Sequence, residues 1–123
     1  MSVVGLDHFT IITADLRATR EFYADVLGLM EGPRPPFDFP GAWFYCGDRP
    51  IVHVIAGREP KGLTTGPVDH IALRAGRFDD FLARIEARGV AYRQKIVPLL
   101  GTRQVFMTDP NGIRLELNFD PAG

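Results

Sequence analysis

The chain contains an internal repeat of about half its length. Residues 6–11 (LDHFTI) have a counterpart in residues 68–73 (VDHIAL), 62 positions later. Each copy is followed by an amphipathic segment that closes on a glycine, Gly28 in the first half and Gly89 in the second. Because a repeat at a fixed distance requires the same small unit to form twice, it constrains the architecture more than any single motif does.

The size and composition of the chain exclude several classes of protein. Its 123 residues suffice for one domain with a real core. The net charge of -1 gives no electrostatic reason to expect nucleic acid or an anionic membrane as partner. No apolar run approaches the roughly 20 residues that span a bilayer, and the N-terminus has no signal-peptide pattern. A single cysteine, Cys46, fits a reducing compartment. We expect a soluble, cytoplasmic protein.

The first half predicts a strand, a helix and two further strands. Residues 3–13 form the first strand, and Asp15 is suited to cap a helix that runs to Gly28 with apolar residues at helical spacing. Residues 32–41 contain four prolines and predict a semi-rigid loop. Strands are expected over residues 42–46 and 51–56, joined by a turn.

The second half repeats this order after a connection rich in glycine and proline. It predicts a strand over 68–74, a helix over 78–88, and strands over 91–97, 102–108 and 113–119, with a tight turn at 109–112. This alternation indicates an α+β chain. We expect one domain over residues 1–123, made of a first module (about 1–57), a linker (about 58–66) and a second module (about 67–123).

Four potential metal ligands lie at corresponding places in the two halves: His8 and His53 in the first, His70 and Glu116 in the second. A pseudo-twofold axis between the modules would bring them to one point. Three imidazoles and a carboxylate suit Zn, Ni, Co, Mn or Fe. The alternatives are packed histidines, and for Glu116 an exposed carboxylate in a salt bridge with Arg114. The joint pattern favours one divalent metal ion.

Several motifs resemble the vicinal oxygen chelate superfamily, which includes glyoxalase I, extradiol dioxygenases, fosfomycin-resistance enzymes and bleomycin-binding proteins. They are LDH at 6–8, FYADVLGL at 22–29, VDHIAL at 68–73 and DPNGIRLE at 109–116. The resemblance implies two βαβββ modules that form a curved mixed sheet around a metal-binding cleft. It also implies that His8, His70 and Glu116 are ligands. His53 falls where bacterial-type glyoxalase I commonly carries a glutamate ligand.

The glyoxalase-I-like members are the most similar, which implies a metal-dependent lyase or isomerase. In such an enzyme a metal chelates two neighbouring oxygens of a small substrate, and a base moves a proton through an enediolate. Glu116 is the expected catalytic base if its bond to the metal loosens. The alternative is that a metal-bound water is the base and Glu116 is only a ligand. If His53 is not a ligand, an extradiol-type Fe(II) dioxygenase becomes the alternative. A bleomycin-resistance-like binding protein or a fosfomycin-modifying enzyme is a further alternative. No residue indicates glutathione or another thiol cofactor.

Six side chains are candidates for substrate contact. Aromatic residues on one strand and in the proline-rich loop suit a pocket wall or lid, and arginines suit an anionic substrate group; core packing or surface salt bridges are the alternatives. The six are Trp43, Tyr45, Phe37, Phe39, Arg74 and Arg103, the last beside Gln104. Since curved sheets leave edges and an open face, we also expect a homodimer.

Overall fold

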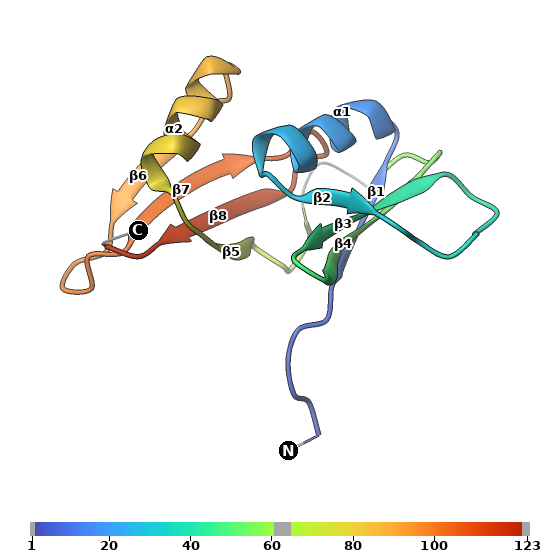
Figure 1. The fold of residues 1–123 in the computed structure, drawn as a ribbon, viewed down its shortest axis with the longest axis horizontal. Coiled ribbons are helices and arrows are strands. Elements are labelled where there is room, and N and C mark those ends of the chain that lie inside the picture. Colours follow the sequence, from blue (N-terminus) through green and yellow to red (C-terminus); the bar gives the residue numbers. More distant parts are fainter. Residues whose placement is uncertain (1, 61–64, 122–123) are drawn as a thin grey trace. The chain divides into compact units, whose positions relative to one another are not determined.

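The computed structural model describes residues 2–60 and 65–121. The chain divides into two compact units, Met1–Lys61 and Gly62–Gly123. Each unit corresponds to one copy of the sequence repeat (Figure 1).

The first unit is a four-stranded mixed sheet with one helical segment. Its elements are β1 (Phe9–Thr13), α1 (Leu16–Glu21), the π-helical turn η1 (Phe22–Val26), β2 (Met30–Gly32), β3 (Gly41–Cys46) and β4 (Arg49–Ala56). The strand order is β1-β4-β3-β2. β1 runs parallel to β4, whereas β3 is antiparallel to both its neighbours.

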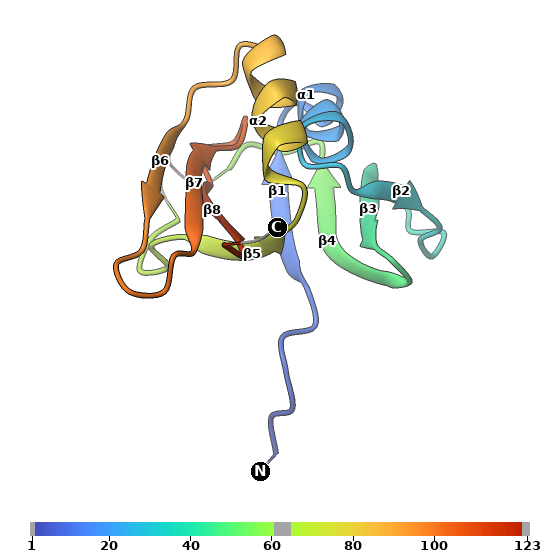
Figure 2. The ribbon, with the colours of Figure 1, turned by 60° about the vertical axis from the view of Figure 1, so that its left-hand side comes forward.

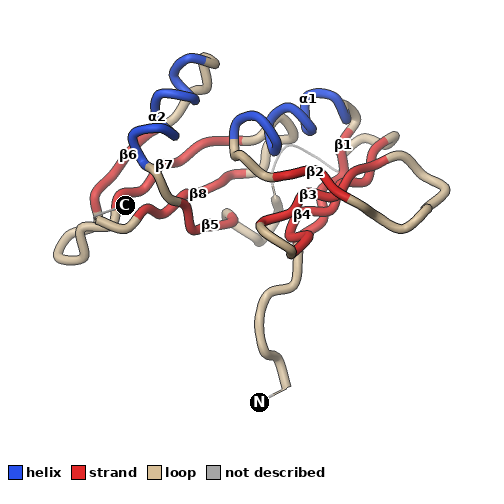
Figure 3. Tube along the Cα trace, in the orientation of Figure 1, coloured by secondary structure: helices blue, strands red, loops and turns tan. Residues whose placement is uncertain are grey.

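The second unit has the same topology. Its elements are β5 (Ile71–Ala75), α2 (Phe78–Ala87), β6 (Arg93–Ile96), β7 (Arg103–Thr108) and β8 (Arg114–Phe119), and the strand order is β5-β8-β7-β6 (Figure 3). β5 is parallel to β8, and the other pairs are antiparallel. The α+β class and the two βαβββ modules predicted from the sequence are thereby confirmed.

The strand registers repeat as well as the topology. Thr10 lies opposite His53 in the β1–β4 pair, and Ala72 lies opposite Glu116 in the β5–β8 pair. His53 and Glu116 therefore occupy equivalent positions in their sheets, as the sequence offset of 63 predicted.

In each unit the helix covers one face of its own sheet and leaves the other face open. Tyr23 of η1 packs against Phe44 of β3 at 6.0 Å between ring centroids, and both are fully buried. In the second unit the Phe78 and Phe81 rings of α2 lie 5.2 and 5.5 Å from Phe119 of β8. Residues alternate between the two faces along each strand, so the polar candidates His53 and Glu116 lie on the open faces.

Local polar contacts explain where the helix and turn begin. The Asp15 carboxylate accepts the Ala18 N–H at 3.0 Å, which confirms the predicted N-cap. In the predicted 109–112 turn, buried Asp109 accepts the N–H groups of Asn111 and Ile113, both at 2.8 Å. The turn thus leads into β8, the strand that carries Glu116.

Two strand predictions were wrong. Residues 3–8 do not belong to β1. They extend from it as a segment without regular secondary structure (Figure 2), and Val3, Val4 and Leu6 are exposed. The β1–β4 ladder stops at Phe9–Val52, two residues short of Pro50, which has no N–H to donate. β2, a three-residue strand directly before Pro33, was missed. No described helix is long and apolar enough to cross a membrane.

Candidate metal centre

The predicted metal ligands form two pairs, one in each unit. In each pair, one ligand precedes the first strand of the unit and the other lies in the strand that runs parallel to it. His8 and His70 directly precede β1 and β5, one residue outside the strands in which they were expected. His53 and Glu116 lie within β4 and β8. Among the described residues, no group of three or more His, Cys, Asp or Glu side chains is close enough to hold a metal ion. The four-ligand site stays a prediction.

An aspartate orients the leading histidine in both units. His8 Nδ1 lies 2.6 Å from Asp7 Oδ2, and His70 Nδ1 lies 2.8 Å from Asp69 Oδ2. The hydrogen bonds to His8 and His70 are the main reason that the pKa values of Asp7 and Asp69 lie below the ordinary value. A carboxylate acceptor places the proton on Nδ1 and leaves the Nε2 lone pair free, as metal-binding histidines require.

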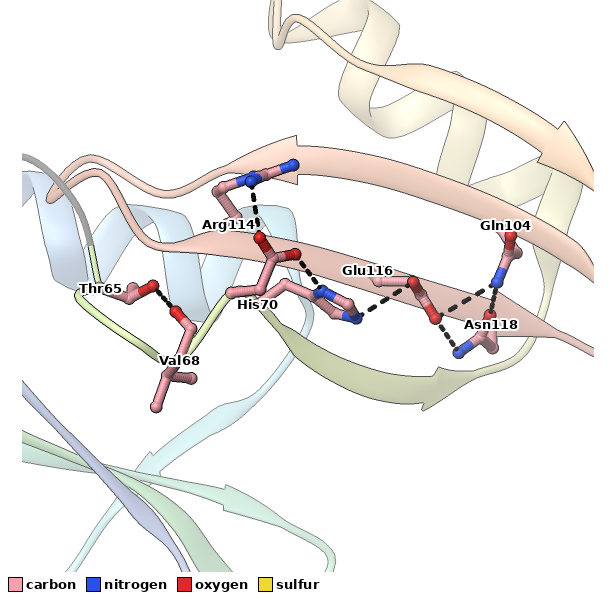
Figure 4. A network of polar contacts seen from close by, with 8 residues as sticks. Thr65, Val68, His70, Gln104, Arg114, Glu116 and Asn118 are labelled. Atoms are coloured by element: carbon pink, nitrogen blue, oxygen red, sulfur yellow. Dashed lines mark hydrogen bonds and ion pairs between the residues drawn. The ribbon is translucent and has the colours of Figure 1, made fainter.

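Glu116 has one occupied and one available oxygen (Figure 4). Its Oε2 accepts N–H groups from Asn118 at 2.9 Å and Gln104 at 3.2 Å. Gln104 also donates to the Asn118 side-chain oxygen at 3.0 Å, which links the two amides. Oε1 lies 3.4 Å from His70 Nε2, and the Glu116 side chain is only 15% exposed. The amides therefore fix the carboxylate with Oε1 turned to the histidine.

The second unit fits a shared metal ion. Two donor atoms that lie 3.4 Å apart, each about 2.1 Å from one ion, subtend about 108° at that ion, which is close to the tetrahedral angle. His70 directs its Nε2 toward Glu116 Oε1, and that oxygen is the one that the amides do not use. Asp69 is itself held by Arg114, whose Nη1 donates to Asp69 Oδ1 at 3.1 Å. Arg114 thus pairs with Asp69, and the proposed salt bridge to Glu116 is not formed.

The first unit arranges its two histidines differently. The His8 and His53 rings are stacked at 3.7 Å and 15°, and Trp43 stacks on the other face of His53 at 3.8 Å. His53 Nε2 donates to the Pro50 carbonyl at 3.1 Å. Burial, and secondly His8, lowers the pKa of His53. Parallel rings direct their lone pairs along separate planes, so His8 and His53 in this stack do not aim at a common ion.

Two further aromatic candidates lie beside Trp43. Phe37 and Phe39 of the proline-rich loop are stacked at 5.0 Å, and the Phe37 ring lies 6.4 Å from Trp43. The Arg34 guanidinium lies over both phenylalanine rings and donates to the Phe39 carbonyl at 2.8 Å. The loop is therefore an ordered aromatic cover beside Trp43.

The Tyr45 side chain contacts the start of the same loop. Its hydroxyl donates to the Pro33 carbonyl. Its ring packs so closely over Gly32 that a Cβ there would lie 2.8 Å from the ring. The aromatic alternation of β3 thus serves both the His53 stack and the loop.

The two candidate arginines lie on opposite faces of the second sheet. Arg74 is opposite Asn118 in the β5–β8 register and shares the face of Glu116. Arg103 lies on the helix-covered face, with its guanidinium 4.1 Å from the centroid of the Phe78 ring. The structure therefore does not bring Arg103 to the Glu116 face; its neighbour Gln104 lies there instead.

Sequence reasoning missed the residues that position the ligands. Asp7 and Asp69 were visible as part of the repeated Asp-His pair. Asn118 could have been found from its spacing, since it follows Glu116 by two residues on one face of a strand. The contact between Gln104 and Glu116 depends on the β7–β8 register and had no sequence signal.

Comparison with known proteins identifies the family. Residues 5–117 match the Glyoxalase/Bleomycin resistance protein/Dioxygenase superfamily. The chain belongs to this superfamily. Among curated proteins, it is similar to the Arabidopsis thaliana protein Glyoxylase I 4, with 26% identity over 95% of this chain and 71% of that protein.

Several solved structures share the fold. A glyoxalase family protein of Bacillus anthracis superposes with a TM-score of 0.79 at 21% identity, covering 98% of both chains. The fosfomycin resistance protein FosX of Listeria monocytogenes gives a TM-score of 0.74 at 22% identity, covering 95% of this chain and 93% of FosX. At these identities the likeness establishes the fold and leaves the reaction to the site residues.

Proposed function

We propose that this protein is a metal-dependent, glyoxalase-I-like enzyme that isomerises a small substrate bearing two neighbouring oxygens. The observation that carries the proposal is the arrangement of Asp69, His70 and Glu116. It places an oriented imidazole nitrogen 3.4 Å from a carboxylate oxygen that the two amides do not use. The similarity to a plant protein named Glyoxylase I 4 supports the same class of reaction.

His8, His70 and Glu116 form the core of the proposed metal site, and His53 is the fourth candidate ligand. A stacked His53 would have to rotate away from His8 and give up its bond to the Pro50 carbonyl before both rings could serve one ion. A divalent ion held by these residues would polarise a substrate carbonyl and stabilise the negative charge that develops beside it.

Glu116 is the proposed proton carrier. Its Oε2 is occupied by the Gln104 and Asn118 amides, so Oε1 is the atom that would accept a proton once its bond to the metal loosens. Oε1 takes this proton from the substrate carbon next to the carbonyl and returns it to the neighbouring carbon. The hydroxyl proton passes to the former carbonyl oxygen, so the net change is a shift of one C–H and one O–H hydrogen within the substrate, and no oxidant is needed.

Glu116→Gln tests this role. The glutamine keeps an oxygen and the shape of the side chain but cannot carry the proton, so turnover of a hemithioacetal should fall by roughly 10²–10⁴-fold. Glu59→Gln makes the same change at an exposed residue of the other unit and should leave turnover unchanged. Equal turnover of wild type and Glu116→Gln would refute the assignment.

A second candidate, an Fe(II) ring-cleavage dioxygenase, is favoured by the His53 stack. If His53 does not coordinate, His8, His70 and Glu116 are a two-histidine, one-carboxylate set, which leaves open positions for a catechol and oxygen. An oxygen electrode separates the two functions in metal-loaded protein supplied with hemithioacetals or catechols. Oxygen uptake with a catechol, and no isomerisation of any hemithioacetal, would replace the first proposal by the second.

A further inference from the structure

The open face of the second sheet carries a cluster of cations around Glu116. Arg74 of β5 lies opposite Asn118, and Lys95 of β6 lies opposite Gln104, so each neighbours one of the two amides that hold Glu116. Arg93 of β6 lies opposite Phe106, which is itself opposite Glu116. We call Arg74, Arg93 and Lys95 the cationic rim.

The charge of the cationic rim is not balanced within the unit. On the strands of this face, Glu116 is the only carboxylate, and its oxygens face His70 and the two amides. Among the described residues, no carboxylate forms an ion pair with a member of the rim. Three positive charges therefore flank the proposed proton carrier, with no ion-paired carboxylate among the residues that the structure describes.

The rim is specific to the second module. By the repeat, Arg74 corresponds to Ile12 and Asn118 corresponds to Ile55 in the first unit. These isoleucines lie opposite each other on the same face as His53, so the equivalent face is aliphatic and aromatic. Since the fold alone produces both kinds of face, the cations are not a requirement of the βαβββ unit.

Protection of sheet edges is the competing explanation, because β5 and β6 are the edge strands and charged residues prevent edge-to-edge pairing. The Arg93 side chain argues against this role. Its guanidinium lies 5.1 Å from the centroid of the Phe106 ring, so it reaches inward over β7 toward the Glu116 position. A side chain that served only to protect the edge has no need to lie over the face.

We propose that the cationic rim binds a negatively charged group, a carboxylate or a phosphonate, on the part of the substrate that does not react. This inference rests on the proposed function because Glu116 marks the reacting end. Arginine suits planar or tetrahedral oxyanions since its guanidinium donates two parallel hydrogen bonds. Three exposed cations attract one small anion, whereas binding of nucleic acid relies on many more phosphate contacts.

Binding of matched probes tests the inference without any turnover. The probes are 3,4-dihydroxybenzoate, its uncharged methyl ester and the corresponding phosphonate. Affinities are measured by calorimetry, and the contact residues by amide chemical shifts in NMR spectra, with Zn²⁺-loaded and with metal-free protein. We expect each charged probe to bind wild type about tenfold more tightly than the ester at 0.1 M salt. The charged probes should shift the amides of β5 and β6, and the tighter of the two identifies the headgroup.

The triple variant Arg74→Gln/Arg93→Gln/Lys95→Gln should bind the charged probes and the ester equally, with the ester affinity unchanged. Arg88→Gln removes one positive charge after α2 and should keep most of the preference, because exposed charges are screened beyond about 10 Å at 0.1 M salt. A preference that survives in the triple variant, or that Arg88→Gln removes equally well, overturns the inference. If the rim binds the charged probes but no hemithioacetal reacts, only the proposed function fails. If turnover occurs and wild type binds all probes equally, only this inference fails.

Discussion

Asp69→Asn is the substitution that most directly tests whether Asp69 orients His70 and sets its tautomer for metal binding. The carboxylate accepts from His70 Nδ1 at 2.8 Å and is held by Arg114 at 3.1 Å. Asparagine has nearly the same shape but loses the negative charge. It can also present its NH₂ group to Nδ1, which would favour the tautomer with the proton on Nε2.

The size of the effect follows from the exposure of the pair. Loss of a residue that orients a metal-binding histidine typically costs 10–100-fold in metal affinity. The Asp69 side chain is 68% exposed and that of His70 is 42% exposed, so water can replace part of the contact. We therefore expect about a tenfold weaker Zn²⁺ affinity. The free energy of unfolding should hardly change, since exposed ion pairs contribute little to stability.

Competition with a chromophoric chelator measures the Zn²⁺ affinity of wild type and variant. Asp7→Asn, which removes the equivalent contact at 2.6 Å to His8, should weaken binding to a similar degree if both histidines are ligands. Asp48→Asn, in the turn after β3, is the matched control and should bind as wild type. An unchanged affinity in Asp69→Asn would refute the reasoning that the repeated aspartates prepare the ligands.

Three further predictions concern stability, ionisation and assembly. Asp15→Ala removes the acceptor for the Ala18 N–H and should lower the free energy of unfolding by about 1 kcal/mol in a denaturant titration, whereas Asp15→Asn should retain most of it. The hydrogen bond to Glu86 raises the pKa of Tyr92, so the stabilising effect of this bond is present below the usual tyrosine pKa and is lost as the pH rises through the raised value. Glu86→Gln should therefore shift the phenolate absorbance transition of Tyr92 to lower pH, and an unmoved transition would contradict the assignment. Each sheet has two edge strands and an open face, so we expect a homodimer in analytical ultracentrifugation, and a monomer at micromolar concentration would exclude it.

Much of the fold could be predicted because the repeat and the local signals agree. The helix cap at Asp15, the turn at Asp109 and the alternation in β3, β4, β7 and β8 are encoded within short stretches. The start of β1 could not be predicted in the same way. Residues 3–8 have apolar content typical of a strand, but the ladder depends on the partner strand, where Pro50 lacks a donor.

The candidate site was predictable only in part for the same reason. The repeated Asp-His pair and the strand position of Glu116 are local, so the sequence indicated them. The stacking of His53 between His8 and Trp43 depends on register and on side-chain rotation. The placement of Arg103 under α2, and of Gln104 on the other face, depends on which face of β7 the helix covers.

The metal content of the purified protein tests the central claim most directly. Protein prepared without chelator is analysed for its elements beside His70→Ala, in which the imidazole that faces Glu116 is removed. We expect one divalent ion per chain in wild type, and loss of that ion in His70→Ala with the circular dichroism spectrum of the folded protein retained. A full equivalent of metal in folded His70→Ala would contradict it.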